Sequence, residues 1–153
     1  MNNKYICKAK RKDNNEWVTG YYVFQRKCSG VFGQMISELD FDRHLIIDLR
    51  GNSHEVIPKT VVRCTGLEDK NGKLIFEGDV VKADRYIFIV KFGKCGGVAN
   101  DENYGYMGYY FDGFDSMTKD ALWFGLRNDI CYFTDIEVIG NIHDDEEILE
   151  VER

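Results

Sequence analysis

One stretch decides the fold of this 153-residue chain: Thr65-Gly-Leu-Glu-Asp-Lys-Asn-Gly-Lys-Leu-Ile-Phe-Glu-Gly-Asp-Val-Val-Lys82. Its first half contains a polar tetrad that ends in Asn71 and Gly72. These two residue types tolerate the positive backbone dihedrals that a tight reversal requires. The apolar residues Leu74–Phe76 come next and favour a strand. The sequence therefore predicts a hairpin with its turn at Asn71 and Gly72.

The second half of the stretch predicts another turn. Gly78 and Asp79 are typical turn residues, and glycine relieves the steric cost of an unusual backbone conformation there. Val80 then begins a strand, and a further strand is expected over Tyr86–Phe92. Short strands separated by glycine-containing turns favour a small, strongly bent sheet. By analogy with other folds, we expect an SH3-like bent barrel.

Composition limits the class of protein. Aromatic residues make up 14% of the chain and there is a single proline, which suits β-structure. The length is enough for one ordinary domain or two small ones. The sequence has no recognisable secretory signal and no run approaching the roughly 18 apolar residues of a membrane span. A soluble, cytosolic protein with no membrane contact is therefore expected.

The cysteines do not have the spacing of a metal site. There are five, and none forms a Cys-x-x-Cys pair. Structural zinc sites normally show paired ligands at short spacing, whereas single cysteines are commonly buried thiols. We expect reduced thiols, no bound metal and no cofactor. The residues concerned are Cys7, Cys28, Cys64, Cys95 and Cys131.

A basic run lies in the first arm of a hairpin predicted over residues 4–24. It consists of Lys8, Lys10, Arg11 and Lys12. One interpretation is a patch that contacts nucleic-acid phosphates or a partner protein. The other is a solvated edge strand, in which lysines discourage unwanted strand pairing. The run is short, which favours the second interpretation.

Charge is unevenly distributed along the chain. Residues 1–100 contain 17 Lys and Arg against 12 Asp and Glu, a net charge of +5. Residues 101–153 contain 3 against 14, a net charge of −11. The overall charge of −6 argues against non-specific binding of nucleic acid by the whole surface. A local basic face in the first part remains compatible with these numbers.

Two other features have both a functional and a structural interpretation. His44 and His54 flank a strand predicted at Leu45–Leu49, where they could bind metal, transfer protons or simply be solvated. The glycine-rich and aromatic segment 95–114 could stack bases or bind a partner. Its aromatic part, Tyr104–Phe114, contains no basic residue to hold phosphates, so a core strand is favoured there. The sequence does not decide the role of the segment.

The chain shows no catalytic motif. It lacks the nucleophile elbow of hydrolases, the His-Glu-x-x-His motif of metalloproteases and the motif of zinc deaminases. No pair of carboxylates is singled out by its spacing for acid–base chemistry. We therefore expect a protein that is not an enzyme. At the C-terminus, Asp144 and Glu147 form a capping-box pattern that predicts a short acidic helix.

Three segments together resemble the YopX family of bacteriophage and prophage proteins. They are Lys10–Tyr21, Cys64–Lys82 and Glu137–Ile142, and they occur in the family's order over nearly the whole chain. The middle segment carries most of the specificity. The resemblance implies a small β-rich protein in two parts, encoded by a phage or prophage. The family has no established biochemical activity, so the resemblance assigns no functional residues.

These observations predict a mostly β protein of the α+β class. Residues 1–60 are expected to form an N-terminal β-rich part, and residues 61–153 an SH3-like barrel part with the acidic C-terminal helix. The expected function is that of a noncatalytic protein-interaction module that binds a partner protein or itself. The alternative is a nucleic-acid-binding protein that uses the basic N-terminal hairpin.

Overall fold

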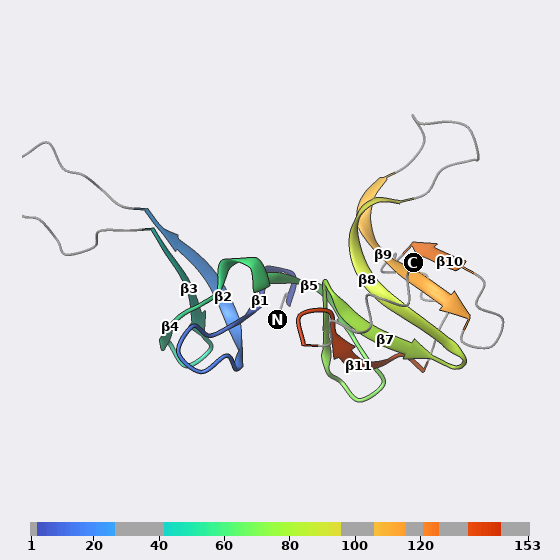
Figure 1. Cartoon of the computed structure of the whole chain (residues 1–153), viewed down its shortest axis with the longest axis horizontal. Coiled ribbons are helices and arrows are strands. Elements are labelled where there is room, and N and C mark those ends of the chain that lie inside the picture. Colours follow the sequence, from blue (N-terminus) through green and yellow to red (C-terminus); the bar gives the residue numbers. More distant parts are fainter. Residues whose placement is uncertain (1–2, 27–41, 96–105, 116–120, 126–134, 145–153) are drawn as a thin grey trace, which may run out of the picture. The chain divides into compact units, whose positions relative to one another are not determined.

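A computed structural model describes residues 3–26, 42–95, 106–115, 121–125 and 135–144 (Figure 1). The first strands in these ranges are β1 (Cys7–Lys10), β2 (Trp17–Gln25), β3 (Arg43–Asp48), β4 (Ser53–Glu55), β5 (Val62–Glu68) and β6 (Leu74–Phe76). They are followed by β7 (Asp79–Ala83), β8 (Tyr86–Cys95), β9 (Tyr106–Asp115), β10 (Ala121–Gly125) and β11 (Glu137–Asn141). Two short 3-10 helices are η1 (Asn3–Tyr5) and η2 (Pro58–Thr60).

The mostly β fold predicted from the sequence is confirmed. The named strands pair in antiparallel fashion and form two sheets. Among the described residues the strands do not close into a barrel, so the SH3-like arrangement stays a prediction. The helix expected after Asp144 falls on residues 145–153, which lie outside the described part of the chain.

The chain folds as two compact units. The N-terminal unit comprises Tyr5–Arg63, and the C-terminal unit comprises Cys64–Arg153 together with Met1–Lys4. Strand β5 runs through this boundary in the sequence. Its first two residues pair with β1, and the remainder pairs with β6.

In the N-terminal unit the strand order is β4-β3-β2-β1-β5. Strand β1 pairs only with the first part of β2, and the last pair is Cys7 with Gly20. Strand β3 pairs with the second part of β2, from Gly20 onward to Gln25. Figure 1 shows β2 and β3 continuing side by side past β1 to the end of the described segment. Residues Tyr21–Gln25 therefore have β3 on one edge, and no described strand pairs with the other edge.

The core of this unit is small. Its buried members are Ala9, Ile46 and Val56, and the half-buried Val18 and Val61 pack against them. One side of the sheet is thus covered close to β1, where three elements contribute apolar side chains. The core does not extend along the full length of β2, whose residues after Gly20 are exposed.

In the C-terminal unit a five-stranded sheet has the order β10-β9-β8-β7-β11. Its core includes the stacked rings of Phe88 and Phe111, whose centres are 5.3 Å apart. Ile75 from β6 and Ile136 just before β11 pack into the same cluster. Burying these apolar side chains supplies the main driving force for folding of the unit.

Candidate functional site

Lys8 and Lys10 of the basic run lie on β1, and Arg11 and Lys12 follow them directly. Lys10 is opposite Trp17 in the register of β1 and β2, so both side chains lie on the same face. The ammonium groups of Lys8 and Lys10 are 4.8 Å and 5.6 Å from the centre of the Trp17 ring. A cation over an indole face is attracted by the negative charge of that face. Trp17 therefore engages both lysines.

The other two cations form ion pairs within the N-terminal unit. Arg11 donates hydrogen bonds from Nε and Nη2 to the two carboxylate oxygens of Asp13. Lys12 donates to Oε1 of Glu55 over 2.9 Å, and Arg43 lies 3.6 Å from Oε2 of the same carboxylate. The hydrogen bond from Arg11 lowers the pKa of Asp13, and the hydrogen bond from Lys12 is the main cause that lowers the pKa of Glu55. Acidic side chains thus offset much of the positive charge of this surface.

An open hollow of about 310 Å³ lies beside these ion pairs. Both cationic and anionic side chains contribute to its wall. A ligand that carries one sign of charge, such as a chain of phosphates, would meet like charge on part of this wall. The lining residues are Arg11, Lys12, Asp13, Ser53, His54 and Glu55.

His54 lies on β4 and contacts the turn that joins β3 to β4. Its Nε2 lies 3.0 Å from Oδ2 of Asp48, and the other oxygen of Asp48 accepts hydrogen bonds from the backbone N–H groups of Arg50 and Asn52. The contact with His54 is the main cause that holds the pKa of the Asp48 carboxyl well below its usual range. This geometry gives His54 a structural partner.

The open edge of β2, which we define as Tyr21–Gln25 on the side away from β3, is the most apolar exposed strand segment of the N-terminal unit. All five of its residues are exposed, and four of them are large and apolar or aromatic. Tyr21 is 42% exposed, Tyr22 and Val23 are each 37% exposed, and Phe24 is 41% exposed. Exposed apolar residues that stand singly are ordinary on a protein surface, but a contiguous group of them marks an interaction site.

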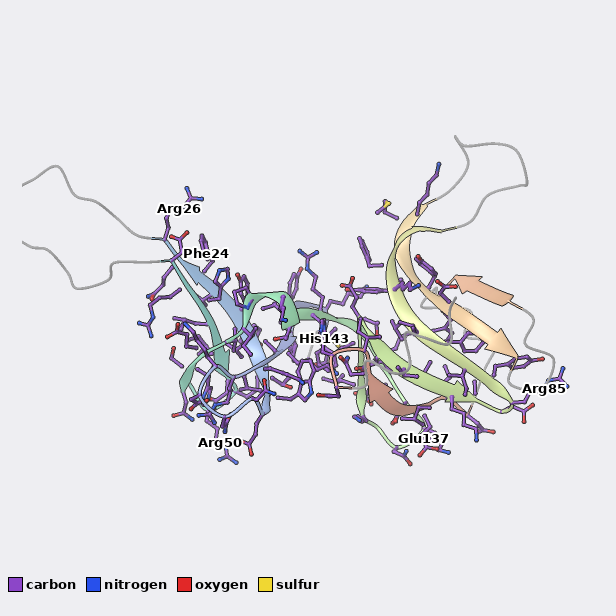
Figure 2. The ribbon with its side chains drawn as sticks, in the orientation of Figure 1. Phe24, Arg26, Arg50, Arg85, Glu137 and His143 are labelled. Carbon is purple, nitrogen blue, oxygen red and sulfur yellow. The ribbon has the colours of Figure 1, made fainter. Side chains whose placement is uncertain are left out.

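One face of this edge carries an aromatic cluster. Phe24 is opposite His44 in the register, and their ring centres are 5.0 Å apart. The hydroxyl of Tyr22 lies 2.6 Å from Nδ1 of the same histidine. The guanidinium of Arg26 lies 6.0 Å from the centre of the Phe24 ring, and Figure 2 shows these two residues at the end of the strand. His44 therefore contacts both Tyr22 and Phe24, and the three rings form one cluster.

The first predicted turn of the central stretch is built around Asp69. Its Oδ1 accepts hydrogen bonds from the backbone N–H groups of Asn71 and Lys73, at 2.8 Å and 2.9 Å. Its backbone oxygen accepts a further hydrogen bond from the N–H of Gly72. Gly72 has a φ of +77°, a backbone conformation that residues other than glycine rarely adopt.

The same turn is attached to β11. The second oxygen of Asp69 accepts a 3.2 Å hydrogen bond from the backbone N–H of Val138, and the N–H of Lys70 donates to the backbone oxygen of Ile136. The Lys70 side chain pairs with the carboxylate of Glu137, whose hydrogen bond is the main cause that raises the pKa of Lys70. Two segments nearly seventy positions apart are therefore joined at this turn.

The second turn of the stretch makes a matching attachment. Gly78 has a φ of +77°, and its backbone oxygen accepts a hydrogen bond from the N–H of Ile142. Asp79 is fully buried, and its Oδ2 accepts a hydrogen bond from the N–H of Phe76. Its Oδ1 accepts a 2.8 Å hydrogen bond from the side-chain amide of Asn141. The predicted turn residues thus position the strands of the C-terminal unit.

A model of the family described as YopX protein matches residues 4–150, which is nearly the whole chain. The chain belongs to the YopX family. No curated protein matches the sequence. Two of the segments that resemble the YopX family, Cys64–Lys82 and Glu137–Ile142, are those that the two turns fasten together.

Sequence reasoning on this YopX-family protein missed several partners. Glu55 and Trp17 engage the basic run, and neither was paired with it from the sequence. Asn141 and Asp69 complete the two turn attachments. Asp69 had a local signal, since an aspartate two residues before Asn71 commonly accepts a hydrogen bond from that backbone N–H. Glu55 and Asn141 are far from their partners in sequence and had no such signal.

The structure describes the surroundings of two cysteine side chains. Cys7 is half-buried, and Cys64 is buried with its Sγ 3.4 Å from the backbone N–H of Gly66. Cys28 and Cys131 lie outside the described residues. Among the described residues, no group of three or more His, Cys, Asp or Glu side chains is arranged to hold a metal ion. The helices described are also too short to cross a membrane.

Proposed function

We propose that this chain is a noncatalytic protein-interaction module in the life cycle of a bacteriophage or prophage, working in the cytoplasm of the bacterial host. Its binding surface is the open edge of β2 with the adjoining cluster of Tyr22, Phe24 and His44. The proposal includes the SH3-like character expected for the bent sheet of the C-terminal unit, which acts as a scaffold.

The observation that carries this proposal is the exposure of five consecutive residues on the open edge of β2. Four of these residues are large and apolar or aromatic. Aromatic side chains that are ordered before binding lose little conformational freedom on contact with a partner, so they are effective anchors of protein interfaces. A strand edge also offers backbone N–H and C=O groups to an added strand. Both properties support a protein as the ligand.

Charge supports a protein ligand over nucleic acid. Asp13 and Glu55 already engage Arg11 and Lys12, and a phosphate would have to compete with these carboxylates. The open edge itself contributes no charge, because residues 17–25 contain no Lys, Arg, Asp or Glu. Aromatic residues could stack on bases, but single-strand binding surfaces combine such residues with cations that follow the backbone. Arg26 is the one cation placed directly at the described cluster.

The proposal is tested by capture from bacterial cells in which the phage or prophage is active. The full-length chain is immobilised, and bound protein and nucleic acid are quantified separately. We expect a protein that is retained by the wild type and by Leu49→Asp, and whose capture falls at least about tenfold with Phe24→Asp. Leu49 is a matched control because it is 62% exposed and lies outside the open edge.

The captured protein is then purified and titrated directly against the same three variants. Equal affinity for wild type and Phe24→Asp would contradict the assignment of the surface. Recovery of nucleic acid instead of protein, in amounts that fall when Lys8, Lys10, Arg11 and Lys12 are changed to alanine, would favour the alternative function.

A further inference from the structure

We infer that the open edge of β2 binds a second copy of this chain, edge to edge, so that the two β2 strands run antiparallel about a two-fold axis at Val23. This inference rests on the proposed function, because it names the occupant of the proposed surface. Three features of the open edge support it: its length, its lack of charge, and the sequence of its side chains, which sets the residues that oppose one another.

The length of the open edge fixes where a second strand can pair. Strand β1 occupies this side of β2 as far as the pair Cys7–Gly20, and the described part of β2 ends at Gln25. Five residues remain, and Val23 is the middle one. When two such segments pair antiparallel over their whole length, Val23 must lie opposite Val23 of the second copy.

This register brings matching side chains together. Tyr22 lies opposite Phe24 of the second copy, and the reverse pair forms at the other end because the interface is two-fold. Directly opposed residues lie on the same face of an antiparallel pair, and aromatic pairs of this kind stabilise a sheet. Tyr22 and Phe24 already share one face with His44 in each copy. The result is a continuous aromatic row built from both copies.

The side chains on the opposite face of β2 also fit this register. Val23 meets Val23 of the second copy, and Tyr21 meets Gln25. No like charges are opposed, because the open edge contains no charged residue. Edge strands that avoid pairing usually carry lysine, proline or a bulge. The open edge of β2 has none of these devices, which is the pattern of an edge that pairs.

The area of contact predicts a weak dimer. Two segments of five residues form an interface below the size of stable complexes, so we expect a dissociation constant in the micromolar range. Sedimentation equilibrium over nanomolar to high micromolar concentrations of the full chain should show a monomer that converts to a dimer. Val23→Lys and Val23→Asp should each remain monomeric, since each places two like charges opposite one another. Leu49→Lys should dimerise like the wild type.

Mixing the two charged variants tests the two-fold axis. An equimolar mixture of Val23→Lys and Val23→Asp should form a one-to-one dimer, because opposite charges then meet at position 23. Circular dichroism establishes that each variant is folded. A monomeric wild type, a dimer that both variants retain, or a mixture that stays monomeric would each overturn the inference. A monomeric wild type that still captures another protein through Phe24 would overturn the inference and leave the proposed function standing.

Discussion

The side-chain amide of Asn141 donates a 2.8 Å hydrogen bond to the buried carboxylate of Asp79, across 62 positions of sequence. Asn141 is itself only 3% exposed, and its Oδ1 accepts a hydrogen bond from the backbone N–H of His143. Strand β11 is therefore attached to the start of β7 by a side chain as well as by the backbone ladder. Because both groups are buried, their hydrogen bonds have no competition from water.

Asn141→Ala should reduce the free energy of unfolding by about 2 to 3 kcal/mol, because it removes a hydrogen bond to a buried carboxylate. Denaturant unfolding followed by tryptophan fluorescence and circular dichroism measures the change. Asn71→Ala is the matched control. Its side chain is exposed, so we expect a change within about 0.5 kcal/mol. Equal losses for the two variants would contradict the attachment of β11 through Asn141.

Gly72 and Gly78 provide a second matched pair. Both have a φ of +77°, but a Cβ at Gly72 would meet nothing within 4 Å. A Cβ at Gly78 would lie 3.2 Å from two carbon atoms of Ile142. We expect Gly72→Ala to cost about 1 kcal/mol of stability through its backbone conformation alone, and Gly78→Ala to cost more.

The same two glycines are compared by thermal and denaturant unfolding of the two alanine variants. Gly78→Val should destabilise further, since a branched side chain fits neither the backbone conformation nor the space beside Ile142. A Gly78→Val variant that melts like the wild type would remove the assignment of this turn.

Asp69 should make stability depend on pH. Burial raises the pKa of its carboxyl, but backbone hydrogen bonds from Lys73, Val138 and Asn71 outweigh that effect and lower the pKa below 3.8. A carboxyl whose pKa is lowered by folding stabilises the folded state above its unfolded pKa, and this contribution is lost as pH falls through the folded value. The free-energy difference between wild type and Asp69→Asn should therefore be largest near neutral pH and shrink below about pH 4.

Denaturant unfolding of these two proteins at a series of pH values from neutral to strongly acidic measures this dependence. Asp13→Asn is a useful comparison in the N-terminal unit, because its carboxyl is exposed and salt screens its ion pair with Arg11. A difference between wild type and Asp69→Asn that stays constant with pH would show that the charge of Asp69 is irrelevant to the turn.

The basic run should bind nucleic acid poorly. We expect no specific binding of duplex DNA, single-stranded DNA or RNA at about 150 mM salt, where charges are screened within about 8 Å. Fluorescence titration with labelled oligonucleotides is the measurement, repeated at lower salt. Each phosphate contact would add about −0.9 to the log–log salt slope on duplex DNA. Submicromolar binding that is lost on changing Lys8, Lys10, Arg11 and Lys12 to alanine, in a variant that stays folded, would reverse this conclusion.

How far the sequence could predict the structure depends on the distance between partners. The turn at Gly72 was predictable because its signals lie within a few residues, and the same holds for Gly78. The ion pair of Lys12 with Glu55 could not be predicted, because Glu55 is 43 positions away and only the strand order brings it close. In the N-terminal unit, Asp13 pairs with Arg11 and Glu55 pairs with Lys12.

The open edge of β2 could not be predicted from the sequence either. Residues Tyr21–Phe24 predict a strand, but their aromatic character suits a core strand as well as a surface. Their exposure follows from where β1 ends, at the pair Cys7–Gly20, and from a core that stops short of this end of the sheet. Neither boundary has a local signal, since both depend on pairing and packing between separate strands.

Hydrogen–deuterium exchange at the open edge of β2 tests the central claim most directly. Backbone amides of Tyr21–Gln25 are measured in the full chain at a low and a high protein concentration, with Val23→Lys as the control. We predict that exchange in this segment slows at high concentration in the wild type and not in the variant, because strand pairing protects the edge amides. Exchange in Tyr21–Gln25 that is the same at both concentrations would contradict the claim that this edge binds a second copy.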